Sequence, residues 1–178
     1  MKWLLVILLS LFAGACKKKP VVKKSNSYIF SISNFLDGKN KLHHDSLSVL
    51  YYDKTVSIGN TTETKRYKTL QWDVEYKPFV VSELQKSSWY DYIAKDSTGN
   101  TVIYTTHNTS IPVKKMILDY ENGVLQDVKI WKGTKSIFLE NNTELYLDKE
   151  GNSRITQKQK LLFFAPKIMS ITIHPVRK

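Results

Sequence analysis

The sequence predicts an all-β protein, built as an antiparallel meander of about ten strands. From Tyr28 onward, short runs rich in Ile, Val, Tyr, Thr, Phe and Trp alternate with clusters of Gly, Asn and Asp, a pattern typical of strands joined by turns. In addition, no stretch of the chain has apolar residues at a sustained helical spacing. Pattern alone leaves open a barrel, a half-barrel or a two-sheet sandwich.

The strands are expected wherever period-two alternation of apolar and polar residues lies between turn residues. A short helix is expected at residues 82–85, which have capping-box spacing. In the last strand, Met169, Ile171 and Ile173 fall on one side. The other expected strands are residues 28–33, 46–53, 67–76, 89–94, 101–106, 136–140, 143–148 and 153–159, with a loop at 95–100 and turns at 141–142 and 149–151.

The clearest hairpin spans residues 116–131 and turns at Glu121-Asn122-Gly123. A two-residue Asn-Gly loop would pair Leu118 with Asp127 and Met116 with Lys129, which mixes core and solvent residues on one face. A three-residue loop with a left-handed, bulged Gly123 pairs Tyr120 with Val124 and Met116 with Val128, which gives a cleaner apolar face. The sequence therefore predicts the bulged, three-residue turn.

The first sixteen residues have the layout of a secretory signal. Lys2 is basic, residues 3–12 are almost wholly apolar, and three small residues, 13–15, directly precede Cys16, the one cysteine of the chain. The apolar stretch of residues 3–15 is shorter than the ~20 residues that a membrane-spanning helix needs. A short buried N-terminal helix is the alternative, but this stretch offers only Ser10 for a polar face.

Residues 12–16, Phe-Ala-Gly-Ala-Cys, resemble the lipobox of a bacterial lipoprotein signal, although alanine stands at position 13 where leucine is usual. The resemblance implies that Cys16 is acylated and that the signal is removed, so that acyl chains hold the protein to a membrane. The residue after the cysteine is Lys17, not the aspartate that retains many lipoproteins at the inner membrane. The resemblance therefore implies an outer-membrane location facing the periplasm.

Charge and composition divide the chain into a signal (residues 1–15), an acylated cysteine with a basic tether (16–26) and a single β domain (27–178). The formal net charge is +11, but six of the lysines lie in residues 1–24, which leaves +5 for the rest. The excess charge therefore lies next to the anchor, where it suits an anionic membrane or acts as a solvated spacer. An exported, anchored protein is a poor partner for nucleic acid.

No pattern in the sequence identifies an active site. A nucleophile-elbow motif, a phosphate-binding glycine loop and a nucleotide fingerprint are all missing. The pair His43-His44 beside Asp45 suggests a metal site, but neighbouring strand residues point to opposite faces, so a solvated loop is favoured. We expect no metal, no cofactor and no catalysis, while a site assembled in space stays possible in principle.

Aromatic residues are dense between residues 67 and 104. Exposed together, they would form a platform for sugars, peptides or lipid tails, because Tyr and Trp combine a broad apolar face with a polar tip. Ordinary packing in the core of the sheet is the favoured interpretation. The candidate binding residues are Trp72, Trp89, Tyr90, Tyr92 and Tyr104.

These observations favour a lipid-anchored envelope protein whose β domain is a non-catalytic binding or structural module. The chain is similar in this respect to small lipoproteins of Gram-negative envelopes. The partners expected are the membrane, through the anchor, and an apolar ligand or an envelope protein. Two alternatives remain: a lipid carrier similar to lipocalins or to lipoprotein-receptor half-barrels, although the lipocalin Gly-x-Trp signature is missing, and a hydrolase of glycan or wall material. The oligomeric state is left open.

Overall fold

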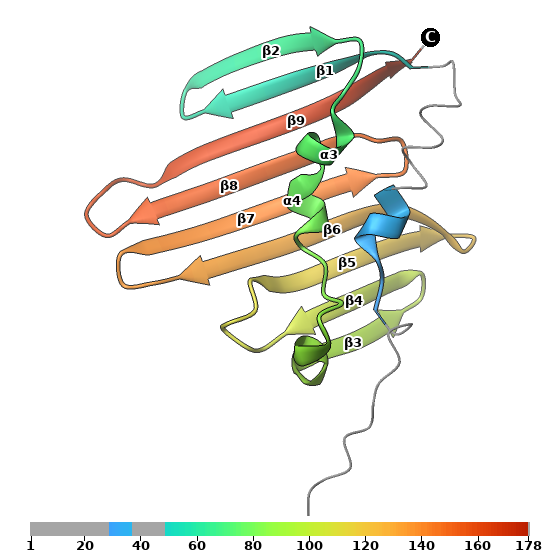
Figure 1. Ribbon diagram of the computed structural model, residues 1–178, viewed down its shortest axis with the longest axis vertical. Coiled ribbons are helices and arrows are strands. Elements are labelled where there is room, and N and C mark those ends of the chain that lie inside the picture. Colours follow the sequence, from blue (N-terminus) through green and yellow to red (C-terminus); the bar gives the residue numbers. More distant parts are fainter. Residues whose placement is uncertain (1–28, 37–48, 178) are drawn as a thin grey trace, which may run out of the picture.

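The computed structural model describes residues 29–36 and 49–177, and nine strands of this part form one antiparallel sheet (Figure 1). The strands are β1 (Val49–Ile58), β2 (Thr61–Tyr67), β3 (Ile93–Thr98), β4 (Thr101–Thr106), β5 (Val113–Glu121), β6 (Val124–Lys135), β7 (Leu139–Asp148), β8 (Ser153–Leu161) and β9 (Lys167–Arg177).

The predicted all-β antiparallel meander is confirmed, because β3 to β9 lie side by side in chain order and β1 and β2 then add beyond β9. The outer strands β2 and β3 each have a single neighbour, so the sheet stays open and does not close into a barrel. An open sheet agrees with the half-barrel or sandwich of the prediction. In the described part of the chain, no helix is long and apolar enough to cross a bilayer.

One face of the sheet carries the hydrophobic core. Met116 pairs with Ile130, and Leu118 pairs with Val128, so alternate residues of β5 and β6 place four buried side chains on the same side. The same rows continue onto β7, β8 and β9 through Leu145, Leu147, Ile155, Ile171 and Ile173. This alternation is the sequence signal that predicted the strands.

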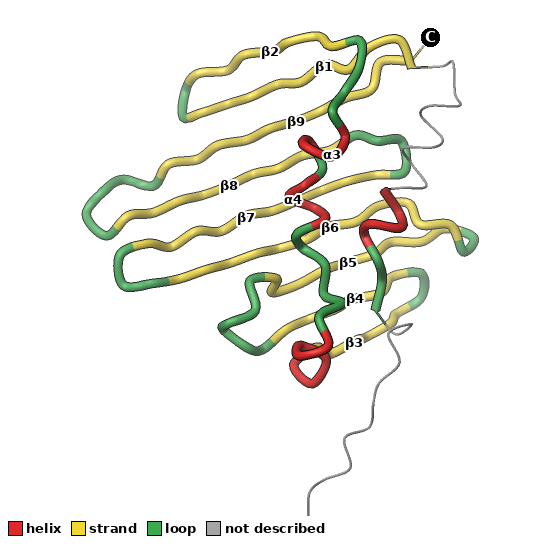
Figure 2. Tube along the Cα trace, in the orientation of Figure 1, coloured by secondary structure: helices red, strands yellow, loops and turns green. Residues whose placement is uncertain are grey.

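A strap of short helices covers this apolar face (Figures 1 and 2). The strap follows β2 and contains α3 (Trp72–Glu75), α4 (Lys77–Val80) and the 3₁₀ helix η2 (Ser87–Tyr92), and residues 32–36 add a further helical turn. The strap residues Tyr76 and Phe79 are almost completely buried between the strap and the sheet. Because Tyr76 and Phe79 are three residues apart, helical turns place both rings on the side that faces the sheet.

Polar contacts fix the strap in place. Glu75 forms an ion pair with Lys54 of β1, with a distance of 2.6 Å between Lys54 Nζ and Glu75 Oε1. The Tyr76 hydroxyl donates a hydrogen bond of 3.1 Å to the carbonyl of Gly151 in the β7–β8 turn, and burial raises the pKa of this hydroxyl. Glu83 accepts a hydrogen bond of 2.8 Å from the backbone N–H of Ser33. The strap is therefore tied both to the sheet and to the N-terminal helical turn.

Five local predictions before β4 were wrong, and the strap accounts for four of them. The fifth is the loop expected at residues 95–100, because residues 95–98 belong to β3 and only Gly99 and Asn100 form the turn. Residues 67–76 read as a strand because they are rich in aromatic and β-branched residues, but the chain leaves β2 at Tyr67 and turns into α3. The expected strand at 89–94 is a 3₁₀ helix until Ile93, and residues 32–33 of the expected first strand are helical. Residues 82–85 are not helical, since the helix lies just before them. Burial against the sheet overrides strand propensity in these segments.

Later predictions were more accurate. The turn at residues 149–151 is confirmed, because Leu147 pairs with Ser153 across it. The turn expected at 141–142 is wrong: both asparagines lie inside β7, and the chain reverses at residues 136–138 instead. Ser136 stabilises that reversal, since its N–H donates a hydrogen bond of 2.8 Å to the carbonyl of Leu139. Residues 46–48 of the expected second strand lie outside the described residues.

The β5–β6 hairpin has the predicted apolar face but a different turn. Glu121 pairs with Val124, so the loop has two residues, Asn122 and Gly123, with φ angles of 51° and 76°. The pairing then shifts by one between Asp119 and Tyr120, as expected for a bulge in β6. Asn-Gly is the preferred pair for such a left-handed turn. A bulge is therefore present as predicted, but within the strand pair and not in the turn.

We expect Gly123→Val to lower the free energy of unfolding by about 1 kcal/mol or more, because a β-branched residue resists positive φ. A Cβ added at this position meets no atom within 4 Å, so backbone strain is the main effect expected. Gly123→Asn is the matched control, since asparagine tolerates this conformation. Thermal unfolding checks the prediction, and equal melting temperatures for the two variants would contradict it.

Candidate binding site on the open face of the sheet

The face of the sheet opposite the strap carries polar and aromatic residues in rows that cross the strands. One row runs through Lys129, Tyr146, Arg154 and Thr172, which pair in sequence across β6, β7, β8 and β9. The neighbouring row holds Trp131, Glu144, Thr156 and Ser170. The described helices all lie on the other face (Figure 2), so these side chains line an uncovered surface.

Two hollows in this surface join into one groove. The first, of about 310 Å³, extends over β6 to β9 and is lined by Trp131, Tyr146, Arg154 and His174 among others. The second, of about 520 Å³, continues towards the ends of the strands and includes Lys158. Trp131, Glu144 and Thr156 line both hollows. We call this continuous surface the open-face groove.

Two aromatic rings form the apolar part of the open-face groove. Trp131 and Tyr146 are diagonal neighbours on β6 and β7, because Lys129 pairs with Tyr146 and Trp131 pairs with Glu144. Each ring has a lysine nearby: Lys115 Nζ lies 5.6 Å from the Trp131 ring centroid, and Lys129 Nζ lies 6.0 Å from that of Tyr146. Burial also raises the pKa of the Tyr146 hydroxyl.

A charge cluster closes one side of the groove. Lys129 Nζ lies 3.1 Å from Asp119 Oδ2 and 3.0 Å from Asp127 Oδ1; the second contact is an ion pair without good hydrogen-bond geometry. Thr101 donates a hydrogen bond of 2.7 Å to Asp119, and this bond, with help from Lys129, holds the pKa of Asp119 below its ordinary value. Asp127, followed by Asp119, raises the pKa of Lys129. Asp119 and Lys129 therefore stay ionised at neutral pH.

The opposite side of the groove offers groups with unused hydrogen-bonding capacity. Glu144 and Arg154 are exposed on adjacent strands, and neither takes part in an ion pair within the described residues. His174 is exposed, and its Nδ1 lies 3.0 Å from Asn152 Oδ1. The groove can therefore present a carboxylate, a guanidinium and an imidazole to a bound molecule.

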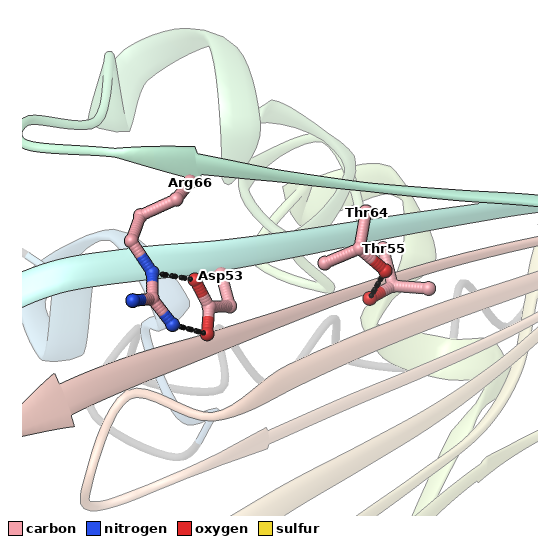
Figure 3. A network of polar contacts seen from close by, with 4 residues as sticks. All are labelled: Asp53, Thr55, Thr64 and Arg66. Atoms are coloured by element: carbon pink, nitrogen blue, oxygen red, sulfur yellow. Dashed lines mark hydrogen bonds and ion pairs between the residues drawn. The ribbon is translucent and has the colours of Figure 1, made fainter.

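The polar surface continues beyond the groove onto β1 and β2 (Figure 3). Arg66 donates two hydrogen bonds of 2.6 and 2.7 Å to the carboxylate of Asp53. These hydrogen bonds are the main reason why the pKa of Asp53 is lowered. The hydroxyls of Thr55 and Thr64 lie 2.9 Å apart in the next pair on the same face of the ladder. These four side chains therefore satisfy one another.

The aromatic residues singled out from the sequence lie elsewhere. Tyr104 is buried in the core, and Trp72, Trp89 and Tyr90 are half-buried on the strap and pack against the core. Trp72 stacks on Tyr76 with ring centroids 4.5 Å apart. Tyr92 alone of the five is exposed. The structure therefore does not bring them together as one exposed platform.

Sequence reasoning missed Trp131 and Tyr146. The signal was present, because Lys129 and Trp131 alternate with the buried Val128 and Ile130 along β6. That alternation assigns Trp131 to the solvent side. The density of aromatic residues pointed to residues 67–104. The exposed rings are identified instead by their position in a strand relative to the buried apolar residues.

Two other sequence-based candidates lie outside the described residues: Cys16, and the pair His43-His44. Within the described residues, no three His, Cys, Asp or Glu side chains gather so as to hold a metal ion. No protein-family model, curated protein or solved structure matches this chain.

We expect Thr101→Val to raise the pKa of Asp119 towards its ordinary 3.8, because the largest stabilising hydrogen bond to the carboxylate is lost. A carboxyl with a lowered pKa stabilises the fold above its ordinary pKa, and this contribution is lost as the pH falls through the lowered value. In the variant, the carboxylate should therefore contribute less to stability at neutral pH, and less stability should be lost as the pH falls below 3.8.

The measurement is an NMR titration of the side-chain carboxyl carbon of Asp119, combined with acid unfolding. Thr105→Val is the matched control, because Thr105 lies on the same strand but pairs with Lys115. An Asp119 titration that is the same in the two variants would contradict this account.

Proposed function

We propose that this protein is a lipid-anchored component of the bacterial envelope whose β domain binds a polar ligand, without catalysis, in the open-face groove. One observation carries the proposal: two hollows on the side of the sheet away from the strap meet at Trp131, beside Glu144 and Arg154, which form no ion pair within the described residues. A concave surface with an aromatic wall and a few convergent polar groups is the usual form of a ligand site.

The chemistry of the groove fits a carbohydrate. A sugar ring has an apolar face that packs on Trp or Tyr and a rim of hydroxyls that need donors and acceptors. Trp131 and Tyr146 supply the ring faces, and Glu144 and Arg154 supply an acceptor and a donor on adjacent strands. Glycans are also abundant in the compartment that the signal resemblance implies.

A lipid carrier is a weaker fit to this geometry. The apolar face of the sheet, where acyl chains would lie, is already filled by side chains of the strap and of the N-terminal helical turn, namely Ile32, Tyr76, Phe79 and Leu84. A lipid would have to displace these groups and break the contact between Lys54 and Glu75. The open-face groove needs no such rearrangement.

The carboxylates near the groove also favour binding over hydrolysis. A glycan hydrolase needs a carboxyl with a raised pKa to act as the acid. The pKa of Asp119 is instead lowered, and both Asp119 and Asp127 contact Lys129. These groups are well suited to hold the shape of the groove wall.

We expect Trp131→Ala to weaken glycan binding about tenfold, because an aromatic contact contributes roughly 0.5–1.5 kcal/mol beyond its buried area. The probes are muropeptides from peptidoglycan and core oligosaccharides from lipopolysaccharide, measured by saturation-transfer NMR and calorimetry. Trp131→Phe keeps a ring and should recover most of the affinity. Tyr92→Ala is the control, since Tyr92 is exposed on η2, away from the groove. Equal affinities for all variants, or no binding by the unaltered protein, would refute the proposal.

The anchor is tested separately. We expect Cys16→Ala to leave the β domain folded, because residue 16 lies before the whole described structure, but to release the protein from the membrane without detergent. Mass spectrometry of the native chain should show a cleaved N-terminus with acyl groups on Cys16. An intact N-terminus with an unmodified thiol, or a variant that still requires detergent for extraction, would contradict the anchor and the outer-membrane address.

A further inference from the structure

One end of the sheet carries an unusual concentration of exposed apolar side chains. They lie in two neighbouring turns, β6–β7 and β8–β9, which we call the apolar tip. Phe163 is 88% exposed and Ile137 is 80% exposed. The apolar tip comprises Ile137, Phe138, Leu162, Phe163 and Phe164.

The two turns of the apolar tip form one surface. The N–H of Leu162 donates a hydrogen bond of 3.1 Å to the carbonyl of Phe138, so the β8–β9 turn is fixed against the β6–β7 turn. Ile168, which is half exposed, accepts a hydrogen bond of 3.0 Å from Gly59 of the β1–β2 turn, so a third turn continues the same end of the sheet. Figure 1 shows these three turns at one end of the strands.

The shape of this surface distinguishes it from the groove. The apolar side chains stand on turns that project beyond the ends of the strands, so they meet a plane more readily than they enclose a ligand. Large apolar patches on a protein surface mark a contact with a partner or a membrane. The charges around the patch decide between these two.

The charges around the apolar tip are almost all positive. Four exposed lysines lie at the adjoining ends of β6 to β9, where Glu140 is the acidic residue and pairs with Lys135 and Lys160. Near the β1–β2 turn, Glu63 forms an ion pair with Lys65. A ring of lysines around projecting aromatic and aliphatic groups matches a bilayer, whose anionic headgroups surround an apolar interior. The lysines are Lys135, Lys158, Lys160 and Lys167.

We propose that the apolar tip inserts into the surface of an anionic phospholipid membrane, with the surrounding lysines on the headgroups. This contact uses residues 135–168 and is independent of acylation at Cys16. Docking by the turns at this end fixes how the strands stand on the membrane, whereas an acyl anchor on a tether leaves the orientation free. Docking in this way places the apolar tip in the interface between membrane and water. The β5–β6 turn, at the other ends of the strands, then stays in water.

The test compares tryptophan probes at the two ends of the sheet. Phe163→Trp reports the apolar tip, and Val124→Trp is the matched control, because Val124 is also an exposed apolar residue (59%) but lies at the start of β6, next to the β5–β6 turn. The full chain is reconstituted in vesicles of phosphatidylcholine and phosphatidylglycerol whose acyl chains carry bromine, a quencher of tryptophan fluorescence. The emission of the unaltered protein is subtracted from that of each variant.

We expect the added emission of the Phe163→Trp variant to be quenched and shifted to the blue, and that of the Val124→Trp variant to remain as in water. Equal quenching at both positions, or emission as in water from both, would overturn the proposal, and the second result would point to a protein partner. Because the result is a difference between two variants that are anchored in the same way, it does not depend on glycan binding or on how the chain is anchored.

The lysines are tested in the background of the Phe163→Trp variant. Changing Lys158, Lys160 and Lys167 to glutamine should lower the ratio of docked to undocked protein by about fivefold for each lysine removed. Vesicles without phosphatidylglycerol should have a similar effect on the unaltered lysines. Quenching that is unchanged in both experiments would refute the part of the proposal that concerns anionic lipid.

Discussion

The structure depends on one constraint: an open sheet must bury its apolar face, and this chain does so with a strap that has almost no regular structure of its own. Tyr76, Phe79 and Leu84 are nearly inaccessible although the helices that carry them are about one turn long or absent. Isolated helices of this length are not stable in water. The strap and the sheet therefore form together, since each buries the apolar surface of the other.

This arrangement separates stability from recognition. The covered face holds the apolar rows, and the polar contacts at its margin, Lys54 with Glu75 and Tyr76 with Gly151, attach the cover. The opposite face needs no apolar residues for folding, so it can carry Trp131, Tyr146 and charged groups in an exposed array. An open sheet with one face covered by the strap thus provides a base for side chains that need not contribute to the core.

The sequence predicted the second half of the fold better than the first, for a physical reason. From β4 onward the strands are long, alternate regularly and join neighbours in chain order, so local pattern and tertiary structure agree. Before β4, residues such as Trp72 and Tyr90 have high strand propensity, but they serve to cover the sheet. No local signal distinguishes an aromatic residue of a cover from one of a strand.

The candidate site was accessible to sequence reasoning only in part. Once Val128 and Ile130 are assigned to the core, Lys129 and Trp131 must face the other way. Their neighbours across the sheet, Tyr146 and Arg154, depend on the register of the β6–β7 and β7–β8 hairpins, and the turn of the first was predicted at residues 141–142 instead of 136–138. The groove itself depends on the register of four consecutive strands, which composition does not encode.

The polar ladder on β2 has a consequence for assembly. An open sheet leaves backbone donors and acceptors unpaired along both outer strands, and another extended chain could extend the sheet there. All seven residues of β2 are exposed, and among them are Glu63, Lys65 and Arg66, while β3 carries Lys95 and Asp96. Burying such charges between stacked strands is costly, so these margins resist the addition of further strands and the growth of fibres.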